Sequence, residues 1–96
     1  MSMIAENHSV SVKLINGDEA DIICDLMEEL NDDLIIEDHA TYITIQRERE
    51  ELRFPMDEIA EAMGRPYTVS NFLAVLATYK GYIEVNDDNV VIRDEG

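Results

Sequence analysis

The chain is poor in the residues that mark several common protein classes. Its 96 residues contain one cysteine, Cys24, no tryptophan, two prolines and four glycines. A single cysteine excludes an internal disulfide and any cysteine-rich metal site, and it suits a reducing compartment. No apolar run approaches the ~20 residues that span a bilayer. The N-terminus lacks the basic start and apolar stretch of a secretory signal, so the sequence predicts a cytoplasmic protein.

Basic residues are also scarce. Seven Lys and Arg stand against 22 Asp and Glu, which gives a net charge of −15. Binding to DNA or RNA needs clustered basic residues that neutralise phosphates, so nucleic acid is excluded as a direct partner. An anionic membrane is disfavoured for the same reason. A soluble protein partner with a basic or mixed surface is compatible with this charge.

Hydrophobic periodicity predicts a single α+β domain in which helices pack on antiparallel sheet. The expected helices cover 18–30, 55–63 and 69–79. The expected strands cover 9–15, 34–36, 41–47, 52–54, 82–85 and 89–93. Asp18 and Thr68 are the predicted N-caps, and Gly64 is a predicted C-cap. The order is strand–helix–strand–strand and then strand–helix–helix–strand–strand, which reads as one motif used twice. Residues 1–8 are expected to form a short flexible tail, and residues 9–96 the domain.

Patterns for catalysis or metal binding are missing from the sequence. The two histidines, His8 and His39, fall in the tail and in an expected turn, and no nucleophile stands beside a base. The glycines are isolated, so there is no phosphate-binding loop. Zinc, calcium and di-iron ligand spacings do not occur. Cys24 is expected to be a small, half-buried apolar residue. The sequence therefore predicts a non-enzyme with no catalytic residue, no cofactor and no metal site.

The segment 66–79 differs from the rest of the chain because it carries no charged residue. On a helix over 69–79, a wheel places Val69, Phe72, Leu73 and Leu76 toward the core, with Val75 and Tyr79 beside them. The opposite face carries small, weakly polar residues: Ser70, Asn71, Ala74, Ala77 and Thr78. Charge depletion is typical of the centre of a protein interface. The segment predicts a partner-binding surface, and the alternative is that another part of the chain covers it.

Several spaced motifs together resemble a known family. The run Met63-Gly64-Arg65-Pro66-Tyr67-Thr68-Val69 leads into the uncharged segment, Phe72-Leu73 lie within it, and Gly81 follows it. Further back, the family's central hairpin has its counterpart in 35–40 and 42–45, and its first strand and helix have theirs in 13–26. In their order and spacing these segments, which extend over 10–93, resemble the effector proteins of bacterial multicomponent di-iron monooxygenases. That family includes the regulatory proteins of soluble methane monooxygenase and phenol hydroxylase.

The resemblance implies two strand–helix–strand–strand units in a corner-like arrangement, and a protein without a cofactor. It also implies a partner, the hydroxylase component, whose oxygen activation and substrate access the effector tunes while coupling electron transfer to hydroxylation. The family's contact segment falls on Val75, Ala77, Thr78 and Tyr79. The wheel agrees on Ala77 and Thr78 but turns Val75 and Tyr79 toward the core. A monomer is expected for the free protein.

Three other functions remain open at this stage. A small-molecule-sensing regulatory domain would need a pocket with convergent polar groups. An acidic module that mimics nucleic acid would bind a DNA-binding protein, although it would not need the uncharged segment. An enzyme that uses a pair of carboxylates would turn over substrate in isolation.

Overall fold

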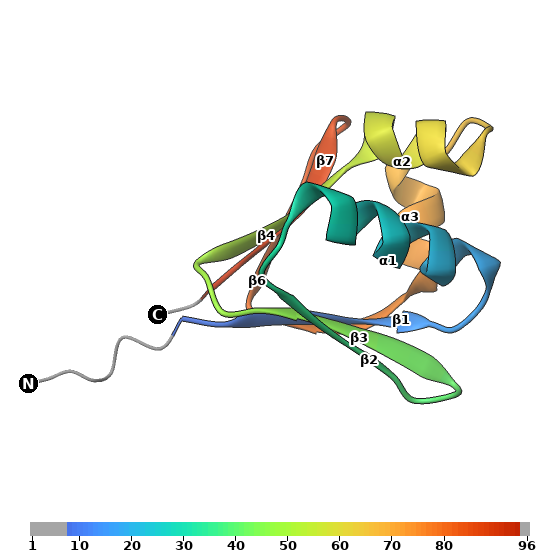
Figure 1. The fold of residues 1–96 in the computed structure, drawn as a ribbon. Helices are drawn as coiled ribbons and strands as arrows, with labels where there is room; N and C mark the ends of the chain where they lie inside the picture. Colours follow the sequence, from blue (N-terminus) through green and yellow to red (C-terminus); the bar gives the residue numbers. More distant parts are fainter. Residues whose placement is uncertain (1–7, 95–96) are drawn as a thin grey trace, which may run out of the picture.

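Residues 8–94 are described by the structure, a computed structural model (Figure 1). Except for His8, the expected N-terminal tail lies outside these residues. The side chain of His8 contacts the carboxylate of Asp94 at the other end of the described chain. The elements, in chain order, are β1 (Val10–Ile15), α1 (Asp18–Leu30), β2 (Leu34–Asp38), β3 (Tyr42–Arg47), β4 (Glu51–Pro55), α2 (Met56–Met63), α3 (Val69–Val75), β5 (Leu76–Lys80), β6 (Tyr82–Val85) and β7 (Asn89–Arg93).

The strands form two antiparallel sheets, a four-stranded sheet in the order β2-β3-β1-β5 and a three-stranded sheet in the order β4-β7-β6. The predicted α+β class is confirmed. The first, second and third strands of the first unit are β1, β2 and β3, and those of the second are β4, β6 and β7. Both units therefore place their third strand between the other two, which agrees with one motif used twice. The additional strand, β5, joins the sheet of the first unit beside β1.

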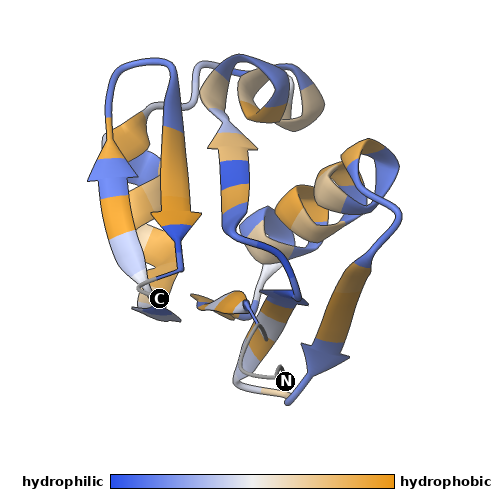
Figure 2. Cartoon of the chain, turned by 90° about the vertical axis from the view of Figure 1, so that its left-hand side faces the viewer, coloured by the Kyte–Doolittle hydropathy of each residue, from blue (hydrophilic) through white to orange (hydrophobic). Residues whose placement is uncertain are grey.

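The two sheets meet as a corner, and the helices lie on the inner side of that corner (Figure 1). Both sheets and all three helices contribute to one cluster of buried apolar residues. β1 shows how the sequence produces this arrangement, because Val10, Val12 and Leu14 are fully buried while Lys13 and Ile15 are exposed. Figure 2 shows the apolar residues concentrated in strands and helices, with polar residues in the turns.

The first helix begins differently from the prediction. Gly17, not Asp18, is the N-cap, and no side chain caps the helix. Asp18 is the first helical residue, where its charge still interacts favourably with the N-terminal end of the helix dipole. Cys24 is buried more deeply than the sequence suggested. Burial, reinforced by nearby acids led by Asp21, raises the pKa of its thiol to about 12, so the thiol stays protonated and unreactive.

The prediction of a helix over 69–79 is wrong in its second half. α3 ends at Val75, and Leu76 turns the chain into β5 with an extended backbone. Leu76–Lys80 pairs with β1, whose edge would otherwise expose unpaired backbone groups. Thr78 and Tyr79 also favour a strand over a helix. Leu73, which the wheel placed in the core, is instead 40% exposed.

Gly81 joins the two sheets and is expected to tolerate no side chain. Its backbone has a φ of +124°, and a Cβ there would lie 2.3 Å from the carbonyl oxygen of Arg93. Gly64 is the matched control, because it is the left-handed C-cap of α2 with open space around it. We expect Gly64→Ala to cost about 1 kcal/mol and Gly81→Ala ~3 kcal/mol or more. Urea unfolding of both variants measures the difference, and equal losses would contradict the expected clash.

Candidate partner-binding surface

The N-terminus of α3 is fixed by a reciprocal pair of hydrogen bonds. The backbone N–H of Asn71 donates to Oγ1 of Thr68 at 3.4 Å, and the backbone N–H of Thr68 donates to Oδ1 of Asn71 at 3.0 Å. This is a capping box, in which each side chain satisfies a backbone donor of the other residue. The prediction that Thr68 is an N-cap is confirmed, and the Asn71 side chain is held at the start of the helix.

Phe72 anchors α3 to the rest of the molecule. Its ring is fully buried and lies 4.8 Å, centroid to centroid, from the ring of Phe54 on β4. Val69 and Val75 are half-buried and pack against the same core. The opposite face of the helix, which carries Ser70 and Ala74, is left exposed. A short helix with one apolar side therefore presents its small residues outward.

β5 continues this exposed region along the edge of the four-stranded sheet. It is antiparallel to β1, with Lys80 opposite Ser11 and Thr78 opposite Lys13. The register shifts by one residue at Leu14, which leaves Ala77 as the extra residue of a bulge. β1 lies on one side of β5, and within residues 8–94 no strand pairs with its other side. The backbone of this side is therefore open to a partner.

The structure places most of the predicted site residues on one exposed stretch of chain. We call it the α3–β5 surface, and it consists of Ser70, Asn71, Ala74, Ala77, Thr78 and Tyr79. Tyr79 is 41% exposed, as the family resemblance implied and the wheel did not. Val75 is half-buried against the core, as the wheel placed it. Val75 lies within α3, where the wheel applies, whereas Tyr79 lies on the edge strand β5, where the wheel does not apply.

Two large apolar side chains in this region were missed by the sequence analysis. Leu73 is 40% exposed beside the small residues of α3, and Tyr82, at the start of β6, is 63% exposed. The helical wheel placed Leu73 toward the core because it included residues 76–79, which are not helical. The alternation Tyr82, Ile83, Glu84 could have indicated that Tyr82 is exposed. Ile83 packs against the core, and neighbouring side chains of a strand point to opposite faces.

The α3–β5 surface lies in an acid-free part of the sequence. No Asp or Glu occurs between Glu61 and Glu84, although 22 of the 96 residues are acidic. Two cations, Arg65 and Lys80, bound the uncharged segment. An exposed face without acids is unexpected in a protein of net charge −15, because solvated faces of acidic proteins carry most of the charge. Its composition matches the charge-depleted centre of an interface.

Tyr67 ties the start of this region to the first helix. Its hydroxyl donates to Oε1 of Glu19 on α1 at 2.7 Å, and its ring is buried. The guanidinium of Arg65 lies 5.7 Å from the ring centroid of Tyr67 and 3.7 Å from Oε2 of Glu19. Burial, with the hydrogen bond to the charged Glu19, raises the pKa of Tyr67. The three side chains fix the loop that delivers the chain into α3.

Tyr67→Phe is expected to lower stability by about 1 kcal/mol at neutral pH, because the hydrogen bond to a partly exposed carboxylate is lost. The raised pKa in the folded state means that wild type loses this advantage as pH rises above the unfolded value of about 10. The difference between wild type and Tyr67→Phe should therefore shrink in alkaline solution. Thermal unfolding of both proteins at neutral and alkaline pH measures it, and a pH-independent difference would contradict the assignment.

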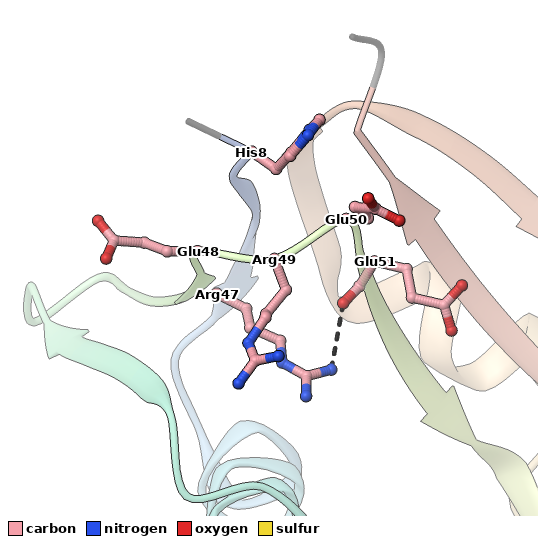
Figure 3. Close-up of a pocket in the computed structure, with 6 residues that line it drawn as sticks. All are labelled: His8, Arg47, Glu48, Arg49, Glu50 and Glu51. Atoms are coloured by element: carbon pink, nitrogen blue, oxygen red, sulfur yellow. Dashed lines mark hydrogen bonds between the residues drawn. The ribbon is translucent and has the colours of Figure 1, made fainter. Parts of the chain in front are cut away.

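A charged depression near the ends of the described chain could also hold a ligand. It is lined by His8 and by the turn from Arg47 to Glu51 (Figure 3). Arg47 donates to the carbonyl of Glu51 at 3.2 Å, and Arg47 and Arg49 both contact the carboxylate of Asp33. Partial desolvation opposes ionisation of Asp33, but the hydrogen bond and charges of these arginines outweigh it and lower its pKa. The positive charges of Arg47 and Arg49 are therefore already paired with the carboxylate of Asp33.

Residues 8–94 contain no group of three or more His, Cys, Asp or Glu side chains placed to hold a metal ion.

His39, the second histidine, lies in the turn between β2 and β3. Its ring stacks on Tyr42 with a centroid separation of 4.8 Å, and it contacts Glu37 at 3.2 Å. Within the described residues, no helix is long and apolar enough to cross a membrane.

A sequence profile of the MmoB/DmpM family matches residues 8–93. The chain belongs to this family. The match covers every strand and helix described above, including α3 and β5. No curated protein sequence matches the chain.

Solved structures share the fold of this family member. A chain of a phenol hydroxylase–regulatory protein complex matches with a TM-score of 0.79 at 21% identity, over 88% of this chain and 97% of that one. The soluble methane monooxygenase regulatory protein B matches with a TM-score of 0.71 at 23% identity, over 99% and 71%. A second phenol hydroxylase–regulatory protein complex matches with a TM-score of 0.74 at 19% identity, over 88% and 98%.

Proposed function

We propose that this protein is a cofactor-free effector that binds the hydroxylase component of a multicomponent di-iron monooxygenase. In this role it tunes oxygen activation and substrate access and couples electron transfer to hydroxylation, without catalytic groups of its own. The observation that carries the proposal is the MmoB/DmpM family match over residues 8–93. The likeness in fold to a chain of a phenol hydroxylase–regulatory protein complex supports it.

The contact with the hydroxylase is proposed to lie on the α3–β5 surface together with Val75. Three features of the structure support this choice. The surface is exposed, it carries no acid, and it ends in an edge strand whose outer backbone is open within the described residues. Small side chains at Ser70, Ala74 and Ala77 allow the partner's backbone to approach closely, and the exposed Tyr79 supplies an aromatic anchor of the kind enriched at interface centres.

An effector that has no catalytic groups of its own can act on the hydroxylase only by binding it. A protein that only binds can change a rate only if it binds one conformation of the hydroxylase more tightly than another. Equal affinity for two conformations shifts nothing, however tight the binding is. The α3–β5 surface must therefore fit the oxygen-reactive conformation of the hydroxylase preferentially. The capping box and the anchored Phe72 hold the α3 part of that surface rigid, which is what selection of one conformation requires.

We further propose that residues 9–96 act as one effector domain, that the free protein is a monomer, and that it works in the cytoplasm. A reducing compartment suits its one buried, free thiol. The charge of −15 favours a protein partner over nucleic acid or an anionic membrane.

Reconstitution tests the function directly. The tagged protein is used to capture its partner from host cells grown on an inducing hydrocarbon, and the captured material is analysed for iron and sequenced. The purified hydroxylase, supplied with its electron source, is then assayed with increasing amounts of the effector. We expect a saturable rise in the hydroxylation rate and in the product formed per electron consumed. An unchanged rate and an unchanged product ratio would overturn the proposal.

A further inference from the structure

The outer face of the four-stranded sheet is the side turned away from the helices, which lie on the opposite side (Figure 1). Strand register determines which side chains share it, since directly paired residues of antiparallel strands point to the same face. Lys13 is paired with Thr44 on one side and Thr78 on the other, and Ile15 is paired with Tyr42. We call this the outer β face. It includes Lys13, Ile15, Tyr42, Thr44, Thr78 and Lys80, and also Glu37 of β2, which is paired with Thr44.

The charge on the outer β face is opposite to that of the molecule as a whole. No Asp or Glu occurs within β1, β3 or β5, which are neighbours in the sheet. The chain has only two lysines, Lys13 and Lys80, and both lie on this face. The one acid of these four strands that shares the face is Glu37 on β2, the edge strand farthest from β5, whereas Asp38 is paired with the buried Ile43 and lies on the opposite face. A protein of net charge −15 thus has one sheet face on which two lysines outnumber a single acid, Glu37.

The two lysines are exposed and have no carboxylate partner within residues 8–94. Nζ of Lys13 lies 4.8 Å from the ring centroid of Tyr42, and Nζ of Lys80 lies 3.4 Å from the hydroxyl of Ser9. Within residues 8–94, the cation–carboxylate contacts involve arginine or histidine and not lysine. Ile15, which is paired with Tyr42, is 52% exposed. The face combines two available cations with apolar and hydroxyl groups.

We propose that the outer β face extends the hydroxylase-binding surface, and that Lys13 and Lys80 contact carboxylates on the hydroxylase. The inference rests on the proposed function, and Thr78 connects the two surfaces because it belongs to both. Charge complementarity identifies the partner groups. Discrete carboxylates on a folded protein match two lysines, whereas a continuous polyanion would be repelled by the acid-rich remainder of the molecule.

The consequence is that the charge of this protein orients docking as well as promoting solubility. The acid-rich remainder of the molecule disfavours approach to a carboxylate-bearing surface in orientations that present neither the outer β face nor the acid-free α3–β5 surface. Like-charge contacts in wrong orientations are costly, while complementary charges speed the productive encounter.

Charge reversal at the lysines tests the proposal against a matched control. Lys13→Glu and Lys80→Glu each change the net charge by two, and Arg53→Glu makes the same change on the other sheet, where Arg53 is exposed and pairs with Glu51. Titration calorimetry with the purified hydroxylase measures the affinity of each folded variant. We expect each lysine variant to weaken binding about tenfold or more, and Arg53→Glu to weaken it less than about threefold.

The outcomes separate this proposal from the proposed function. If wild type binds and activates the hydroxylase while both lysine variants bind as well as Arg53→Glu, the outer β face is overturned and the effector function stands. If wild type itself does not bind the hydroxylase, the effector function fails first.

Carbodiimide cross-linking gives an independent measurement on the wild-type complex, because the reagent joins a lysine amine to a carboxylate in contact with it. Peptides that join Lys13 or Lys80 to Asp or Glu of the hydroxylase are expected. Cross-links that involve only the carboxylates of this chain would overturn the proposal.

Discussion

Thr78→Arg is expected to reduce hydroxylase activation at least tenfold while leaving the domain folded. Thr78 is exposed on an edge strand, so the new side chain has room in the free protein. In the complex, the long cation would be forced between closely packed surfaces or would lose its water without a partner, and a buried unpaired charge costs several kcal/mol. Ala74→Arg, on the exposed face of α3, is expected to act in the same way.

The control is Ala62→Arg, which places the same side chain on an exposed position of α2, away from the α3–β5 surface. All three variants should retain wild-type circular dichroism and melting temperatures within a few degrees. Activation is measured with purified hydroxylase over a range of effector concentrations. Full activation by Thr78→Arg and Ala74→Arg, matching Ala62→Arg, would remove the α3–β5 surface from the interface.

Phe72→Ala is expected to give the largest loss of stability, about 3–5 kcal/mol, because it opens a cavity in the core. Phe72 is fully buried, its ring packs on Phe54, and it is the one fully buried side chain of α3. Domains of this size have total stabilities of only about 5–15 kcal/mol. The variant is therefore expected to be marginally folded at room temperature and to lose the ordered α3–β5 surface with its anchor.

The neighbouring residue provides the control. Leu73→Ala removes a similar apolar side chain from a partly exposed position, so we expect it to cost about 1 kcal/mol or less. Urea unfolding followed by circular dichroism compares the two variants. A loss for Leu73→Ala as large as that for Phe72→Ala would show that α3 is rotated from the position described here. Reduced hydroxylase activation by a stable Leu73→Ala would add this side chain to the interface.

Local chemistry determined much of the fold. The helix over 18–30 and the strand β1 were both predicted correctly, because the periodicity that indicates each one lies within its own short segment. Thr68 and Gly64 were also identified as caps, because capping depends on the backbone within one helical turn. The uncharged segment and the family motifs likewise belong to the sequence, so the approximate location of the candidate surface was available before the fold was known.

The tertiary structure decided how that segment is built and what lies beside it. Leu76–Lys80 becomes a strand because β1, more than sixty positions earlier in the chain, offers a free edge, and a helical wheel contains no information about that edge. Sheet pairing also brings Lys13 and Lys80 onto one face. Tyr67 meets Glu19 across 48 positions of sequence. Such contacts form only when distant segments pack, because the free energy that favours them comes from the partner segment and not from the local residues.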